Sequence, residues 1–133
     1  MNYTYENRGH FQYIDRAKQK VEFAGIRYDN ITPTDIDGYF ERHGETFVFF
    51  EVKKRGQELP NGQRLALTRL VDNLRRNGKK AVLFVSVHDV EDCQKSIAAA
   101  RTEVTEIYFD GKWRKGRGTL KEMTDRFVKW SEK

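Results

Sequence analysis

The chain has little cysteine and proline and no long apolar segment. Its 133 residues include one cysteine, Cys93, and two prolines. A lone cysteine excludes an internal disulfide framework and any zinc cluster built on several cysteines. Because disulfides belong to oxidising compartments, the expected setting is the cytoplasm. No apolar run approaches the roughly 18 residues that a membrane-spanning helix requires, so we expect no membrane partner.

The residues that mark several common hydrolase and nucleotide-binding sites are also missing. The three histidines, His10, His43 and His88, are scattered and form no His-Glu-x-x-His pair, so a zinc site is not predicted. Ser86 and Ser96 lack the context of a nucleophile elbow, which removes Ser-His-Asp hydrolysis. No glycine-rich phosphate-binding motif of the P-loop or dinucleotide type occurs.

Positive charge, in contrast, is abundant and segregated. The formal net charge is +5. Residues 53–80 hold nine Lys or Arg against two Asp or Glu, and residues 112–117 hold four cations. Such clustering is typical of a surface that binds a polyanion, and a generally basic solvated surface is the alternative. The predicted nucleic-acid contacts are Lys54, Arg55, Arg64, Arg69, Arg75, Arg76, Lys112, Arg114, Lys115 and Arg117.

The most informative pattern is Asp37, followed fourteen residues later by Glu51-Val52-Lys53. Residues 42–45 are expected to form a turn between two antiparallel strands, of which the second covers residues 46–53. Such a hairpin brings Asp37 opposite the end of the second strand. Strand alternation then places Glu51 and Lys53 on one face of the sheet. Three chemically useful groups are therefore expected to converge at strand ends.

Two carboxylates beside a lysine suit divalent-metal phosphodiester hydrolysis. Carboxylate oxygens bind hard cations such as Mg²⁺. The cation acidifies a bound water, and the lysine offers a compact positive charge to that water or to a phosphate oxygen. A solvated strand end with ordinary surface charges is the alternative. The aromatic-rich approach, Phe47-Val48-Phe49-Phe50, and the basic stretch that follows favour the metal site.

At Asp37, Glu51 and Lys53 the chain resembles the PD-(D/E)XK nuclease superfamily, and most of all its small Holliday-junction-resolvase-like and VRR-type members. The family pattern is an Asp at a strand end, a hairpin and then Glu-x-Lys. The resemblance implies an α/β fold with a restriction-endonuclease-like αβββαβ core over about residues 7–87. In that core helices flank a central mixed sheet. A C-terminal hairpin and helix would complete one domain over residues 1–133.

The resemblance also implies an activity. The expected protein is an endonuclease that hydrolyses DNA with Mg²⁺ or Mn²⁺, on branched or junction DNA among other substrates, with RNA left open. Asp37 and Glu51 would ligate the metal, with the backbone carbonyl of Val52 as a further oxygen ligand. Gln63 stands where several relatives carry a glutamine on the helix after Glu-x-Lys. It would orient a water or touch the scissile phosphate, or else simply solvate the helix start.

Many relatives place one more acidic residue on the first helix. Here Glu6, Asp15 and Glu22 are the alternatives for that metal ligand. Asp35 is a second candidate for the role of Asp37, at a spacing to Glu51 that is two residues longer.

Residues 10–77 are predicted to form further helices and strands around this site. Apolar residues at helical spacing predict a helix over residues 10–24, which ends at Gly25, and a short strand over residues 26–30 follows. Asn61 is the expected N-cap of a helix over residues 62–77, whose buried stripe would be Leu67, Leu70, Val71 and Leu74.

The second half of the chain predicts a nearly all-apolar central strand over residues 81–87. Asp89 would cap a helix over residues 90–101, in which Cys93 packs beside Ile97. A strand over residues 104–109 would turn at Asp110-Gly111. Thr119 and Glu122 fit a capping box for the last helix. In the hairpin, Trp113 would either stack on a base or belong to the core of an edge strand.

Two further expectations concern partners. The apolar side of the last helix, Leu120, Met123, Phe127 and Trp130, would either complete the core or form a homodimer interface. Two-strand cleavage favours the dimer. The alternative to an enzyme is an inactive nuclease-fold module that binds nucleic acid, and a weaker one is a domain whose basic face meets an acidic protein.

Overall fold

The computed structural model describes residues 21–133, and the chain divides into two units, Met1–Pro33 and Thr34–Lys133. Most of the predicted first helix lies outside the described residues. Its last four positions, 21–24, are not helical. Glu6 and Asp15 also lie outside the described residues, whereas Glu22 is exposed.

The predicted strand over residues 26–30 is wrong. A tight turn takes its place, in which Tyr28 and Ile31 pair in an isolated bridge. The two residues between them, Asp29 and Asn30, have φ angles of 51° and 68°. Asp and Asn tolerate this left-handed conformation because their short side chains bond locally. The two apolar residues of this segment, Ile26 and Tyr28, therefore do not make a strand here.

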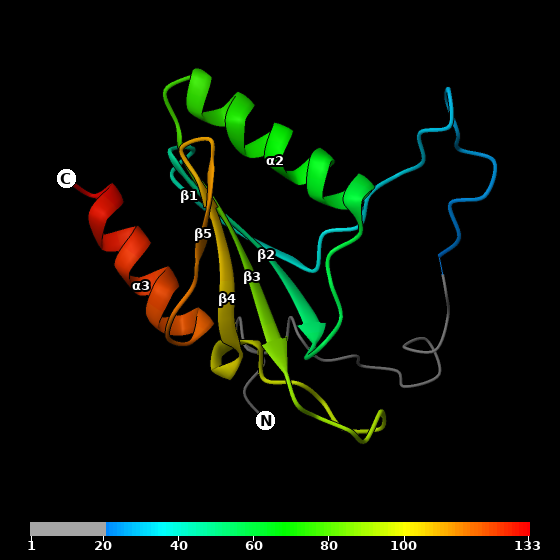
Figure 1. Cartoon of the computed structure of the whole chain (residues 1–133). Coiled ribbons are helices and arrows are strands. Elements are labelled where there is room, and N and C mark those ends of the chain that lie inside the picture. The colour runs from blue at the N-terminus through cyan, green and yellow to red at the C-terminus, as the bar shows by residue number, and fades with distance from the viewer. Residues whose placement is uncertain (1–20) are drawn as a thin grey trace, which may run out of the picture. The chain divides into compact units, whose positions relative to one another are not determined.

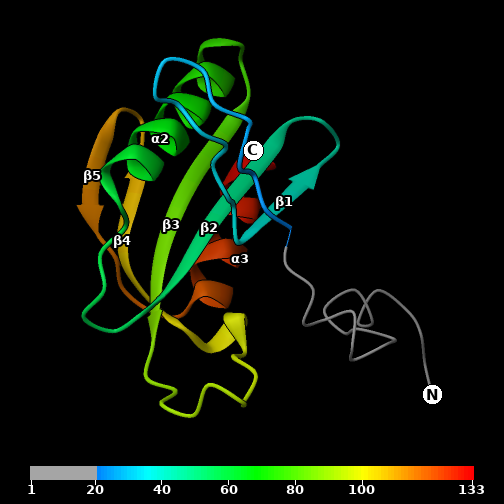
Figure 2. The same cartoon turned by 90° about the vertical axis from the view of Figure 1, so that its right-hand side faces the viewer.

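The unit Thr34–Lys133 is an α/β structure built on a five-stranded mixed sheet with one helix on each face (Figures 1 and 2). The strands are β1 (Gly38–Arg42), β2 (Thr46–Lys54), β3 (Lys80–His88), β4 (Glu103–Phe109) and β5 (Lys112–Lys115), and the helices are α2 (Asn61–Arg76) and α3 (Leu120–Ser131). The strands lie in sequence order across the sheet. Only β2 and β3 are parallel, with α2 as their connection, and the other neighbours are antiparallel.

The β1–β2 hairpin follows the prediction closely. Arg42 pairs with Thr46, and the turn between them uses φ angles of 54° at His43 and 67° at Gly44. The ladder ends at the pair Gly38 and Phe50. Asp37 therefore lies directly beyond the last pair of the ladder, next to the start of Glu51-Val52-Lys53.

Two apolar clusters, one on each face, hold the sheet between the helices. Phe49, Leu83 and Val85 pack against α2, where Leu67 and Val71 are buried and Leu70 and Leu74 lie against the cluster. Alternate residues of the same strands, Val48, Val82 and Phe84, pack against Leu120 and Phe127 of α3. Because β3 is covered on both faces, its sequence is almost wholly apolar, as predicted.

Helix α2 begins one residue earlier than predicted. Its N-cap is Pro60, which makes no side-chain capping bond, so the prediction of Asn61 as the cap is wrong. Proline suits this place because it has no N–H that the helix start would leave unpaired. The helix ends before Gly78, whose φ is 80°.

The predicted helix over residues 90–101 is also wrong. Only a single 3₁₀ turn, Ala99–Arg101, forms in that segment. The segment offers no buried stripe, because Ile97 remains 41% exposed and Cys93 is exposed rather than packed. A short helix without a buried face is marginal in water. Asp89, the predicted cap, instead pairs with Arg55.

The C-terminal elements agree with the sequence. Asp110 and Gly111 form the β4–β5 turn with φ angles of 54° and 74°. The Oγ1 of Thr119 accepts a hydrogen bond from the N–H of Glu122, and the Glu122 carboxylate accepts one from the N–H of Thr119, which is the predicted capping box. Among residues 21–133 no helix has the length and apolar content to cross a membrane.

Helix α3 completes the core of its own chain. Leu120 and Phe127 are buried against the sheet and Met123 packs beside them, whereas Trp130 is 43% exposed. The apolar side of α3 was one argument for a homodimer interface. Most of this side packs against β2, β3 and β4 of the same chain, which supports the core role, and the homodimer stays a prediction.

Candidate functional site

Asp37 and Glu51 are linked by a pair of crossed hydrogen bonds at the end of the β1–β2 ladder. The backbone N–H of Asp37 donates to Oε2 of Glu51 at 2.7 Å. The backbone N–H of Val52 donates to Oδ2 of Asp37 at 2.8 Å. The β1–β2 ladder ends at Gly38, so these two N–H groups have no backbone carbonyl across the ladder. The carboxylates accept their hydrogen bonds instead. Both acids are held on rigid strand ends.

Gln63, in the first turn of α2, joins this pair to a third segment. Its Nε2 donates to Oε1 of Glu51 at 2.5 Å and to the backbone carbonyl of Asp35 at 2.9 Å. The sequence placed Gln63 at this site, and the structure brings it there. Asp35 contributes its backbone oxygen rather than its carboxylate. Of the two candidate aspartates, Asp37 is therefore the one whose carboxylate lies in the site.

Lys53 lies on the same face of β2 as Glu51. Its Nζ is 3.7 Å from Oε1 of Glu51, and its side chain is 22% exposed. The distance is that of an ion pair and is too long for a hydrogen bond. The ammonium group therefore has capacity left for another anion.

Glu51 is a fully buried acid, with a side chain that is 0% exposed. Burial raises its pKa above the ordinary value because the ionised form loses its water. The N–H of Asp37 lowers the pKa, the Asp37 charge raises it, and Lys53 lowers it in part. Lys53 only partly offsets the negative charge of the two neighbouring carboxylates, so a cation bound between them would be stabilised.

The donor set fits a hard divalent cation. Asp37 is exposed, and its Oδ1 accepts no hydrogen bond from any residue within 21–133. Carboxylate oxygens are the preferred ligands of Mg²⁺, which keeps several waters and needs few protein ligands. No cluster of three or more His, Cys, Asp or Glu occurs in the described part of the chain. A third acid from the first helix, Glu6 or Asp15, falls outside the described residues.

Gly38 is a contributor that the sequence analysis missed. A Cβ at this position would lie 2.2 Å from the ring of Phe50, its partner across the ladder. Only glycine lets β1 approach β2 this closely beside Asp37. A glycine directly after a candidate acid, inside an expected strand, is the signal that could have identified it.

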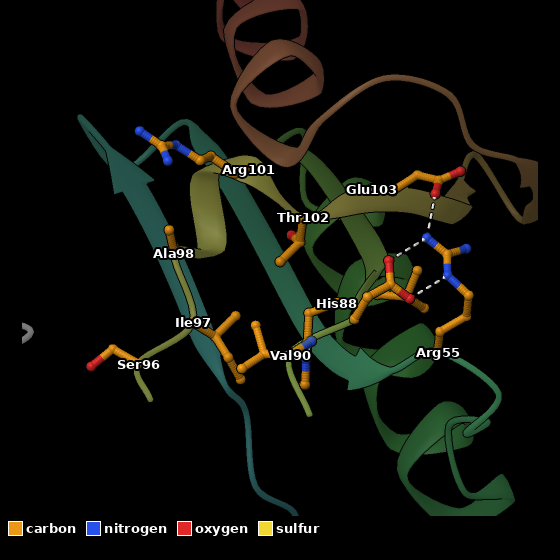
Figure 3. Close-up of a pocket in the computed structure, with 11 residues that line it drawn as sticks. Arg55, His88, Val90, Ser96, Ile97, Ala98, Arg101, Thr102 and Glu103 are labelled. Atoms are coloured by element: carbon orange, nitrogen blue, oxygen red, sulfur yellow. Dashed lines mark hydrogen bonds and ion pairs between the residues drawn. The ribbon is translucent and has the colours of Figure 1, made fainter. Parts of the chain in front are cut away.

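The basic residues directly after Lys53 are paired with acids of the segment after β3 and of the start of β4. Nε and Nη2 of Arg55 donate to Asp89 at 2.7 and 3.1 Å, and Nη2 also donates to Glu103 at 2.7 Å (Figure 3). The hydrogen bonds from Arg55 lower the pKa of Asp89. Lys54 bonds Glu91 at 2.8 Å. The predicted phosphate contact by Arg55 therefore competes with three existing bonds.

These ion pairs border a cavity of about 490 Å³ at the carboxyl end of β3. Figure 3 shows Arg55, His88, Arg101 and Glu103 around it. Nδ1 of His88 accepts a hydrogen bond from the N–H of Val90 at 3.1 Å, which fixes the ring. Positive and negative groups alternate on its wall, so it is not a simple anion pocket.

Two predicted contacts on α2 are also engaged within the chain. Arg64 bonds Glu106 at 3.1 Å and lies 4.3 Å over the ring of Trp113. Arg75 bonds Asp110 at 3.1 Å. Trp113 packs against the α2-side cluster and against Tyr108, which supports the core interpretation of Trp113 over base stacking.

The remaining predicted cations have no acidic partner within residues 21–133. They are exposed on α2 and on the β5 hairpin and comprise Arg69, Arg76, Lys112, Arg114, Lys115 and Arg117. These side chains are the part of the basic surface that is available to a polyanion without breaking an ion pair.

Comparison with protein-family models, with curated proteins and with solved structures gives no match to this chain.

Proposed function

We propose that the protein is an Mg²⁺- or Mn²⁺-dependent endonuclease that hydrolyses phosphodiester bonds in DNA. The observation that carries the proposal is the crossed pair of hydrogen bonds between Asp37 and the Glu51-Val52 segment. It sets an exposed and a buried carboxylate beside Lys53 on rigid elements. The resemblance to PD-(D/E)XK nucleases supports the same assignment.

Each side chain has a definite role in this proposal. Asp37 and Glu51 would hold the metal ion, with the carbonyl of Val52 as a further ligand. The ion would lower the pKa of a water and stabilise negative charge on the phosphate. Lys53 places its ammonium group against a phosphate oxygen or the attacking water. Gln63 fixes the Glu51 carboxylate through its 2.5 Å bond.

The finer fold assignment belongs to the proposal as well. The order β1, β2, α2, β3, with β2 and β3 parallel, supports a restriction-endonuclease-like core. The first of the three strands expected before α2, over residues 26–30, is a turn. The described core thus has two strands before α2, and a first helix would have to come from residues 1–20.

DNA is the proposed partner because the chain carries, besides the acids, a set of exposed cations that have no acidic partner within residues 21–133. The exposed cations of α2 and the β5 hairpin would contact phosphates. Cleavage of both strands, or of two arms of a junction, requires two active sites, which a C2 homodimer supplies. The dimer and the branched substrate remain predictions. Light scattering at micromolar concentration tests the dimer, and a strict monomer without preference for a four-way junction contradicts both.

A metal and substrate panel tests the proposal. The purified chain is incubated with Mg²⁺, Mn²⁺, Ca²⁺ or EDTA on single-stranded, duplex and branched DNA and on RNA. We expect cleavage of DNA in Mg²⁺ or Mn²⁺ and none in EDTA. No cleavage of any substrate in either metal ion overturns the enzyme assignment.

A second candidate function is an inactive nuclease-fold module that binds nucleic acid. The observation in its favour is that the described residues supply two acids rather than three. Calorimetry separates the candidates. Mn²⁺ binding in the micromolar-to-millimolar range that disappears in Glu51→Ala counts against the inactive module, and its absence favours the module.

A further inference from the structure

An exposed aromatic ring lies beside the carboxylates. Tyr39 is on β1, is 55% exposed, and pairs across the ladder with Phe49. The two rings stack with their centroids 5.3 Å apart and an interplanar angle of 11°. Phe49 is 3% exposed and belongs to the cluster under α2. Tyr39 therefore stands on the α2 side of the sheet.

The same face carries the catalytic candidates. Glu51 is two residues after Phe49 on β2, so its side chain points to the same side. Asp37 is two residues before Tyr39 on the chain. Two residues of a strand span about 7 Å. The Tyr39 ring thus lies at about the distance of one nucleotide from the proposed site of hydrolysis.

Within residues 34–133, one face of the Tyr39 ring is covered and the other is open. Phe49 covers the inner face, since the two rings are nearly parallel. β1 is the outermost strand of the sheet that the described residues form. The outer face of Tyr39 is therefore turned away from β2, toward the edge of the sheet. An aromatic ring held by a buried neighbour, with one free face, is the arrangement on which a nucleobase stacks.

We propose that Tyr39 is a stacking platform for an unpaired nucleobase next to the scissile phosphate. The inference rests on the proposed function and narrows its substrate class. A base can reach an aromatic platform only after it leaves the stack of a duplex. The substrate would accordingly contain single-stranded nucleotides, as in a flap, a frayed end or an unpaired branch point.

The neighbouring residue provides a matched control. Phe40 is 41% exposed on the same strand and pairs with Val48, which belongs to the cluster on the α3 face. Tyr39→Leu and Phe40→Leu therefore remove similar exposed aromatic rings from opposite faces of β1. Tyr39→Phe keeps the stacking ring and removes only the hydroxyl.

The test is binding of the full chain, in EDTA, to a short single-stranded DNA that carries 2-aminopurine. Parent, Tyr39→Phe and Phe40→Leu should bind alike and quench the probe. Tyr39→Leu should lose the quenching and bind roughly tenfold more weakly, with little change on a closed duplex. Equal binding and quenching by Tyr39→Leu and Phe40→Leu overturns the platform.

A scan of abasic positions in the DNA tests the same idea with the parent protein, independently of how Tyr39→Leu folds. One abasic position beside the cleaved bond should weaken binding roughly tenfold, and distant positions should not. A parent that cleaves DNA with a flat abasic scan overturns the platform and leaves the nuclease assignment intact. A parent that neither binds nor cleaves any nucleic acid overturns the proposed function itself.

Discussion

Asp37 and Glu51 hold each other in position, since the N–H of Asp37 donates to the Glu51 carboxylate at 2.7 Å. The Asp37 carboxylate accepts in turn from the residue after Glu51, at 2.8 Å. Each acid thus contributes two things to the site, a hydrogen-bonding oxygen and a negative charge. Asn and Gln replacements keep an oxygen acceptor at these positions and remove the charge. They are therefore sharper tools here than alanine.

The buried charge of Glu51 should cost stability. Its pKa is raised in the folded state, so the native protein binds more protons than the unfolded chain as the pH rises from about 4.5 to the raised value. The free energy of unfolding therefore falls across that window and stays lower at neutral pH. Each pKa unit corresponds to about 1.4 kcal/mol.

We therefore expect Glu51→Gln to be more stable than the parent at pH 7, and the difference to shrink toward pH 4. Urea unfolding at several pH values measures this. Glu58→Gln, at an exposed site, is the control and should change stability little at either pH. A Glu51→Gln protein that is less stable than the parent at neutral pH contradicts the account of the buried charge.

A divalent cation should stabilise the parent. A ligand that binds only the folded state adds about 2.7 kcal/mol at a hundred times its dissociation constant. Mg²⁺ or Mn²⁺ should thus raise the melting temperature of the parent and of Asp35→Asn, whose altered carboxylate lies outside the hydrogen-bonded network. Glu51→Gln should show little shift. The same rise in all three proteins would place the ion elsewhere.

Gly38 should be intolerant of a side chain. A Cβ there would lie 2.2 Å from the Phe50 ring, and overpacking of this kind costs about 1–3 kcal/mol. Thermal unfolding of Gly38→Ala measures the loss, and adding Phe50→Leu should recover part of it. Gly62→Ala, in α2 with nothing near its Cβ, should be neutral or stabilising. Equal effects at Gly38 and Gly62 would contradict the packing.

Unpaired cations should dominate the salt dependence of DNA binding. Each phosphate neutralised contributes about −0.9 to the log–log salt slope. Replacing Lys112, Lys115 and Arg117 by alanine should make the slope shallower by roughly 2–3. Arg55→Ala should change it less, because Arg55 is committed to Asp89 and Glu103. A larger change with Arg55→Ala alone would reverse this ranking.

The hairpin and the acids were predictable because their signals are local. A glycine turn fixes the register, and a period of two fixes which side chains share a face, so the spacing of Asp37 and Glu51 sufficed. The α2 stripe and the capping box at Thr119 follow from similarly short-range patterns.

Other features depend on the tertiary structure. The segment after β3 has a cap-like Asp89 but no buried stripe, and a distant arginine recruits that aspartate instead. Trp113 resembled a base-stacking residue until β4 and α2 were placed against it. The pairing of the basic stretch with acids from residues 89–106 likewise has no short-range signal.

The cleavage rate of Asp37→Asn against Asp35→Asn, in Mg²⁺ on the best DNA substrate, tests the central claim most directly. Each change removes one negative charge, and the two positions are two residues apart. Of the two aspartates, only Asp37 has a carboxylate that takes part in the hydrogen bonds that join Asp37, Glu51 and Val52. Asp37→Asn should lose at least about a hundredfold in rate, as loss of a metal ligand or its support does. Asp35→Asn should cleave like the parent. Equal rates for the two variants would contradict the assignment of the site.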